Sequence, residues 1–129
     1  MEKLKSILKE LMQEMGIEEN ISLKIVPMKQ KIASFSFNTK ILRLNQKAVE
    51  ILSDEELKYI LSHELIHLKI KDVNHGFLFM EELKKYYTIE EVHNIEIKII
   101  KNFLSYEDAP LSSIRSSSKF SVKRVAQYN

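Results

Sequence analysis

Residues 53–76 read SDEELKYILSHELIHLKIKDVNHG, and this stretch decides the fold, because it contains one clearly marked helix start and three of the four histidines. Ser53 and Glu56 form a capping-box pattern, and the acidic residues that follow Ser53 suit the positive end of a helix dipole. The pattern predicts a helix that begins directly after Ser53. On a helical wheel, apolar side chains flank His63 and His67 on both sides, so both histidines should point inward or into a cleft.

The pair of histidines has the spacing of a metal site. His63 and His67 lie one helical turn apart, so their imidazoles can bind one ion at about 2 Å each. Glu64 lies close enough to accept a proton from a water on that ion, which completes the HExxH pattern. Zinc would lower the pKa of such a water toward about 7. Metal-free core histidines are the alternative, but the helix cap, the apolar flanks and a third nearby histidine favour the metal site.

A third ligand is needed, because a catalytic zinc takes three protein ligands and leaves one position for water. His75 follows the pair closely enough for the chain to leave the helix and turn back, and Gly76 could supply the unusual backbone angle of that turn. A solvated loop histidine is the alternative. Glu96 is the other candidate ligand, because it falls with His93 on the apolar face of a further predicted helix at 89–104, where polar groups need partners.

Composition excludes several classes of site. The chain has no cysteine, so disulfides, thiolate ligands and cysteine nucleophiles are excluded. A formal net charge of +2 gives no argument for a nucleic-acid partner or an anionic membrane. No apolar run approaches the roughly 20 residues of a membrane span, and the N-terminus lacks a signal-peptide core, so we expect a cytoplasmic protein. The abundance of Lys, Glu and Ile fits a thermophilic source or an AT-rich genome.

The remaining elements are predicted from periodicity and turn residues. Apolar residues spaced by three and four predict an amphipathic N-terminal helix that ends at Gly16. Strand-like segments follow at residues 21–28, 32–37 and 40–45. Asn38 and Thr39 favour a hairpin between the last two. The predicted fold class is α+β, with a small three-stranded sheet, an N-terminal helix, the HExxH helix and a C-terminal helix.

The stretch HELIHLKIKDVNHGFLFMEEL, preceded by KILRLNQKAV and LKYILS, resembles the compact gluzincin-like metallopeptidases, and among them most closely the minigluzincins. It is also similar to small bacterial metal-dependent hydrolases and to SprT-like proteases. The resemblance covers about residues 30 to 85. It is specific at His63, Glu64, His67, His75 and Gly76.

This resemblance implies a zinc-dependent hydrolase of peptide bonds. One zinc ion would be bound by His63, His67 and His75, with Glu64 as catalytic base. Gluzincins in the narrow sense take the third ligand from a glutamate of a later helix, so Glu96 stays open as the alternative. The oxyanion-stabilising group is unassigned among Tyr86, Tyr87 and His93. A non-catalytic zinc-binding regulatory or interaction module is the rival function.

The resemblance also implies roles for the edge of the sheet and for the C-terminal part of the chain. The segment IASFSF, residues 32–37, is expected to pair with an extended peptide substrate, unless it serves only the sheet. Residues 1–105 would form the catalytic domain, and the Ser-rich, basic residues 106–129 a flexible tail. Segments after about Ile89 would keep the enzyme latent by covering the cleft, in cis or by exchange between subunits. The apolar face of the 89–104 helix would suit a homodimer contact.

Overall fold

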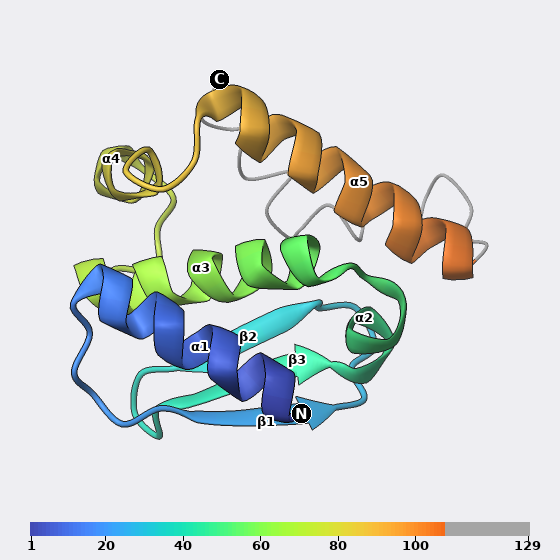
Figure 1. Cartoon of the computed structure of the whole chain (residues 1–129), viewed down its shortest axis with the longest axis horizontal. Helices are drawn as coiled ribbons and strands as arrows, with labels where there is room; N and C mark the ends of the chain where they lie inside the picture. The colour runs from blue at the N-terminus through green and yellow to red at the C-terminus, as the bar shows by residue number, and fades with distance from the viewer. Residues whose placement is uncertain (108–129) are drawn as a thin grey trace.

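The computed structural model describes residues 1–107, and within them the three predicted strands form one mixed sheet. The strands are β1 (Ser22–Val26), β2 (Ala33–Ser36) and β3 (Ile41–Asn45). Their spatial order is β1-β3-β2, with β3 parallel to β1 and antiparallel to β2 (Figure 1). The predicted hairpin of the last two strands is therefore confirmed. Because β3 takes the central place, β2 becomes an edge strand.

Five helices accompany the sheet. They are α1 (Glu2–Met15), α2 (Gln46–Ile51), α3 (Asp54–Ile70), α4 (Phe77–Leu83) and α5 (Ile89–Glu107). The predicted α+β class is confirmed, and α1 ends as predicted at Gly16, whose φ is 71°. Every helix within residues 1–107 is too short or too polar to cross a membrane. Apart from its first two residues, which end α5, the tail predicted at 106–129 lies outside the described residues.

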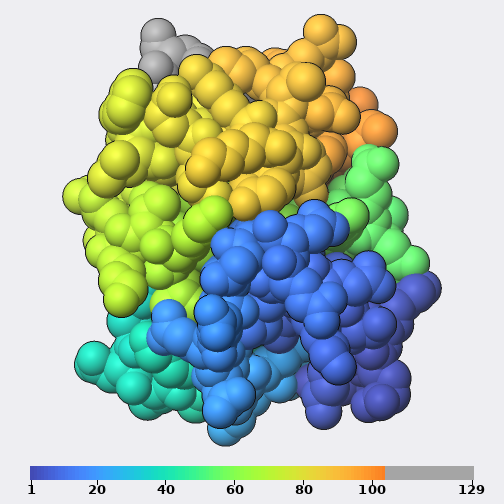
Figure 2. All heavy atoms as spheres, turned by 60° about the vertical axis from the view of Figure 1, so that its left-hand side comes forward, coloured from blue at the N-terminus to red at the C-terminus, as the bar shows by residue number. Residues whose placement is uncertain are grey.

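Helix α3 lies at the centre of the molecule, between the sheet and α5 (Figure 1). The capping box predicted at Ser53 and Glu56 is present at its N-terminus. From Glu56 to Leu68 every residue except Lys58 is buried. A helix that is covered on all sides must be apolar around most of its circumference, which explains the two apolar flanks seen in the sequence. Figure 2 shows the segment from α4 to α5 in yellow and orange directly above the N-terminal region in blue, with little of α3 visible between them.

The apolar face of helix α5 packs against the rest of the chain. The buried residues of this face are Val92, Ile95, Ile99 and Phe103. The face that the sequence suggested for a homodimer contact is thus covered by the chain itself. Asn102 also donates to the carboxylate of Glu56 at 3.2 Å, which fixes α5 to the beginning of α3. His93 is exposed, so the expectation that it lies on the apolar face is wrong, whereas Glu96 is buried there as expected.

Candidate metal centre

Three histidine side chains converge at the C-terminal end of α3. His63 and His67 come from adjacent turns of this helix, and the loop that follows brings His75 back to them. The Nε2 atom of His75 lies 2.8 Å from Nε2 of His67 and 3.2 Å from Nε2 of His63. The candidate ligand atoms of the three residues all lie within 4.8 Å of one another. Within residues 1–107, these three histidines form the group of potential ligands that lie close enough together to hold one metal ion.

The return of the chain to His75 depends on the end of α3. Lys71 adopts a left-handed conformation with φ 56°, and the N–H of Asp72 then donates to the His67 carbonyl at 3.2 Å. The Asp72 side chain accepts from the N–H of Asn74 at 2.9 Å and tightens the turn. Gly76 has φ −89°, and a Cβ there would meet nothing within 4 Å. With ψ −147°, Gly76 lies outside the helical and extended regions, as expected, but the left-handed residue of the turn is Lys71.

The second ring nitrogen of each helix histidine is held by an acceptor. The Nδ1 atom of His67 lies 2.9 Å from the carbonyl oxygen of Asp72, which can only accept, so Nδ1 carries the proton. The Nδ1 atom of His63 lies 3.2 Å from Oε2 of Glu64. A neutral imidazole protonated at Nδ1 presents a lone pair at Nε2. Both helix histidines thus aim lone pairs at the place that they share with His75.

This donor set fits a metal ion. Imidazole nitrogens bound to one tetrahedral zinc at about 2.0 to 2.1 Å are roughly 3 to 3.5 Å apart. The separations of 2.8 Å and 3.2 Å at His75 Nε2 are close to that range. Two lone pairs directed at one place suit a cation there, and an acceptor beside the other ring nitrogen is the usual support of a histidine ligand. The residues present are therefore suited to binding a divalent metal.

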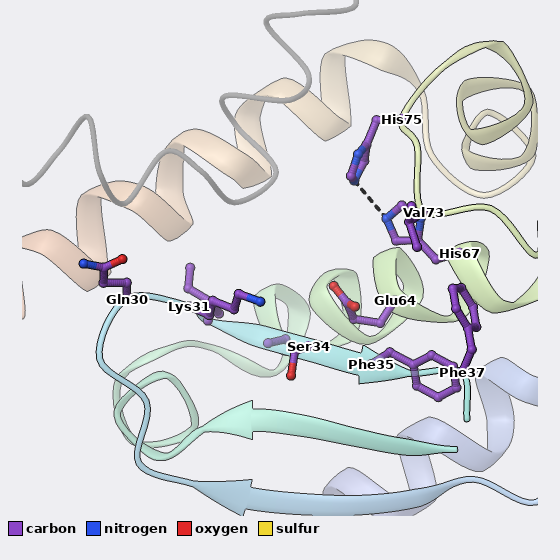
Figure 3. A pocket seen from close by; sticks show the side chains of 11 residues that line it. Gln30, Lys31, Ser34, Phe35, Phe37, Glu64, His67, Val73 and His75 are labelled. Atoms are coloured by element: carbon purple, nitrogen blue, oxygen red, sulfur yellow. Dashed lines mark hydrogen bonds between the residues drawn. The ribbon is translucent and has the colours of Figure 1, made fainter. Parts of the chain in front are cut away.

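Glu64 lies in a cleft beside this centre. The cleft has a volume of about 350 Å³ and runs between helix α3 and β2, which is an edge strand within residues 1–107. Glu64, His67 and His75 line it together (Figure 3). The strand predicted to pair with substrate is thus placed at the edge of the sheet and along the cleft. A carboxylate here can accept a proton from water beside a polarised carbonyl group.

Phe79 was missed by sequence reasoning. Its ring is fully buried, and its centroid lies 4.8 to 4.9 Å from the ring centroids of all three histidines. Phe79 therefore forms an apolar wall that fixes the imidazole planes. The run FLFMEEL predicted a helix, but it did not show which phenylalanine points inward. Phe77, two residues earlier, is 76% exposed.

Helix α4, which carries Phe79, is anchored by the buried carboxylate of Glu82. This carboxylate accepts from Lys69 at 2.6 Å, from Tyr86 at 2.9 Å and from Lys85 at 3.0 Å. Burial opposes the charge of Glu82, but hydrogen bonds from these three side chains hold its pKa below the usual range. Since Lys69 belongs to α3, the contact ties α4 to the helix of the histidine pair. Tyr86 serves this anchor and does not line the cleft.

Glu96 lies near the histidines but outside the converging group. Its carboxylate accepts a hydrogen bond from the Tyr59 hydroxyl, and the Tyr59 ring centroid is 6.3 Å from that of His63. Burial raises the pKa of Glu96 to about 8, against the opposite effect of the Tyr59 hydrogen bond. Burial, followed by the charge of Glu96, also raises the pKa of Tyr59. Tyr87 packs edge-on against Tyr59, and neither Tyr87 nor His93 lines the cleft.

Comparisons with known proteins show what this chain is similar to. Residues 1–81 match the family model described as BlaR1 peptidase M56. The chain is 50% identical over 101 residues to the uncharacterized protein MJ0123 of Methanocaldococcus jannaschii, covering 78% of this chain and 92% of that protein.

Two solved structures are also similar. The metallopeptidase zymogen jannalysin of M. jannaschii matches with a TM-score of 0.73 and 52% identity, covering 76% of this chain and 94% of that chain. The metallopeptidase zymogen abylysin of Pyrococcus abyssi matches with a TM-score of 0.71 and 31% identity, covering 76% and 92%. The resemblance to the minigluzincin metallopeptidases, read from the histidine stretch, is confirmed by these matches.

Proposed function

Because this chain belongs to the BlaR1 peptidase M56 family and is a metallopeptidase of the minigluzincin type, we propose that its metal is one zinc ion bound by His63, His67 and His75. The observation that carries the proposal is the convergence of three imidazole nitrogens beside Glu64 in a cleft. When bound, zinc supplies Lewis-acid chemistry, which polarises a peptide carbonyl and makes water more acidic.

The side chains around the centre have distinct tasks in this proposal. Glu64 accepts the proton of the attacking water and delivers it to the nitrogen of the departing amine. The carbonyl of Asp72 keeps the proton of His67 on Nδ1, so that Nε2 stays available. Within residues 1–107, β2 is an edge strand whose backbone N–H and C=O groups can pair with an extended peptide, which supports a peptide or protein as substrate. The cytoplasmic location and the thermophilic source stay predictions.

The rival is a zinc-binding module without catalysis, and Glu64→Gln separates the two. A glutamine cannot take up the proton, so we expect hydrolysis of casein to fall on the order of a thousandfold. The zinc content measured by elemental analysis should equal that of the wild type, because the proposed zinc ligands are the three histidines and not Glu64. Glu90→Gln, on the exposed side of α5, is the matched control and should keep full activity. Unchanged hydrolysis in the Glu64 variant would contradict the proposal.

We further propose that the C-terminal segment keeps the enzyme latent by covering the cleft, in cis or by exchange between subunits. The two similar solved proteins are metallopeptidase zymogens, and the sequence SSSKFSVKRV alternates as a strand-forming segment would. A segment tethered to the domain also has a high effective concentration at the cleft. Because Asn102 and Phe103 pack α5 into the domain, a test must keep α5 whole.

The test compares the full chain with a chain that ends after Glu107. We expect casein hydrolysis per bound zinc to rise on truncation, by about tenfold or more, since an intramolecular blocker competes strongly with substrate. Removing only residues 126–129 is the control. Equal activity of the full and truncated chains, both folded and loaded with zinc, would speak against latency through this segment.

A further inference from the structure

The two ends of the cleft differ in chemistry. At one end, before β2 begins, the lining comes from Gln30 and Lys31, and at the other end from Phe35, Phe37 and Val73. Figure 3 shows Glu64 between these ends, with the Lys31 side chain extending along the cleft toward it. A peptide lying along β2 would meet a cation on one side of the catalytic carboxylate and apolar side chains on the other.

The basic end is held in place by a buried amide. Asn45 is 2% exposed, and its Nδ2 group donates to the carbonyl of Met28 at 3.0 Å and to that of Lys31 at 2.8 Å. Its Oδ1 atom accepts from the N–H of Lys47, so both the donor and the acceptor end of the amide are engaged. Within residues 1–107 no carboxylate forms an ion pair with the ammonium of Lys31. The cleft therefore has an available positive charge on a fixed backbone.

The opposite end is apolar. The rings of Phe35 and Phe37 meet edge to face with centroids 5.5 Å apart, and both line the cleft while remaining partly exposed. Val73 is 65% exposed and faces the same space (Figure 3). Apolar side chains gathered in a concave wall gain free energy when an apolar ligand group covers them.

The direction of β2 determines which end of a bound peptide lies at each end of the cleft. The strand runs from the Lys31 end toward Phe37, and antiparallel pairing gives better-aligned hydrogen bonds than parallel pairing. An added peptide therefore runs from the aromatic end to the lysine end. Its residues before the scissile bond lie near Phe35, Phe37 and Val73, and its residues after the bond lie near Lys31.

We propose that the cleft selects peptides with a bulky apolar side chain before the scissile bond and an acidic side chain after it. This specificity rests on the proposed function, because it assumes that substrate extends β2 beside Glu64. Lys31 and Val73 are the specificity-determining residues that can be changed without touching the core, since both are exposed.

The test measures binding, so that it does not depend on catalysis. Glu64→Gln protein, both as the full chain and as the chain that ends after Glu107, is titrated into two fluorescent peptides, identical except for Glu or Lys after a central Phe, and the anisotropy gives each Kd. We expect the Glu peptide to bind about fivefold more tightly, the effect of one partly exposed ion pair. Adding Lys31→Glu should reverse the preference. Lys29→Glu is the matched control, because Lys29 lies in the same loop but does not line the cleft.

The apolar end is tested with a peptide in which Gly replaces Phe. Val73→Ser should reduce the preference for Phe by about threefold, whereas Leu78→Ser, an exposed residue outside the cleft, should not. A peptide with the two features in reversed order should bind more weakly than the original. Retention of the Glu preference by the Lys31 variant, tighter binding of the reversed peptide, or no binding of either first peptide to the chain that ends after Glu107 would overturn the proposal. Selective binding without hydrolysis by the otherwise wild-type chain that ends after Glu107 would instead leave it standing and refute only the proposed function.

Discussion

The three-histidine centre and the Tyr59–Glu96 pair are both buried polar sites that begin on α3, yet they are built on opposite principles. In the pair, a hydroxyl donor faces a carboxyl acceptor, and burial keeps the carboxyl largely neutral by raising its pKa to about 8. In the centre, His63 and His67 direct ring nitrogens with lone pairs at the space near His75 Nε2. The Tyr59 donor satisfies one oxygen of Glu96, while the other, Oε1, is buried without a hydrogen-bond partner among the described residues. Converging acceptors, in contrast, are satisfied by a cation.

The two sites also differ in how accessible they are from the cleft. The centre opens to a cleft through Glu64, His67 and His75, so an ion and a substrate can reach it. The Tyr59–Glu96 pair lies in the contact between α3 and α5, and Glu96 is 1% exposed. Access and donor arrangement together favour metal binding at the first site and a structural role for the second.

The largest expected effect comes from variants that test whether the three-histidine centre or the Tyr59–Glu96 pair binds the metal. His67→Ala and His75→Ala each remove one converging nitrogen, so zinc affinity should fall on the order of a hundredfold or more. Glu96→Gln keeps an acceptor for Tyr59 and should leave zinc binding unchanged. Elemental analysis after dialysis, followed by competition with a chromophoric chelator, measures both the stoichiometry and the affinity.

His93→Ala is the matched control for these variants, because His93 is exposed on α5. It should bind zinc as the wild type does. The opposite result would be a Glu96→Gln protein that loses zinc and a His75→Ala protein that retains it. That result would make Glu96 the third ligand and His75 a loop residue beside the site.

The part of the centre that could be predicted from sequence is the part encoded locally. The capping box at Ser53 and the spacing of His63 and His67 are properties of one helix, and they appear in the structure as expected. The place of His75 could be suggested because a short loop has limited reach. The wall made by Phe79 could not be assigned, because it depends on how α4 docks through Glu82 and Lys69.

The sheet shows the same limit. Alternating residues predicted three strands and the hairpin between β2 and β3. The parallel pairing of β1 with β3 joins residues about 20 positions apart, such as Leu23 and Leu42, and no local pattern specifies it. His93 was misplaced for a related reason, since a wheel gives relative faces but not the rotation at which a helix packs. The cleft, which depends on β2 becoming an edge strand, thus required the tertiary structure.

The smallest expected effect concerns pH and tests the Tyr59–Glu96 pair alone, because the raised pKa of Glu96 should make stability fall as the pH rises toward 8. The pKa of Glu96 is raised from 4.5 in the unfolded chain to about 8 in the folded protein. The folded state therefore binds more protons between these values, and the stability that this contributes is complete below about pH 4.5 and lost as the pH rises through 8. Urea unfolding at pH 5.5 and pH 8 should show the wild type losing more stability than Glu96→Gln, by a difference on the order of 3 kcal/mol at most. Glutamine cannot ionise but still accepts from Tyr59, so the difference between the two proteins isolates this one group from the histidines. Parallel pH profiles for the two proteins would mean that Glu96 is already ionised in the folded state, as a metal ligand would be.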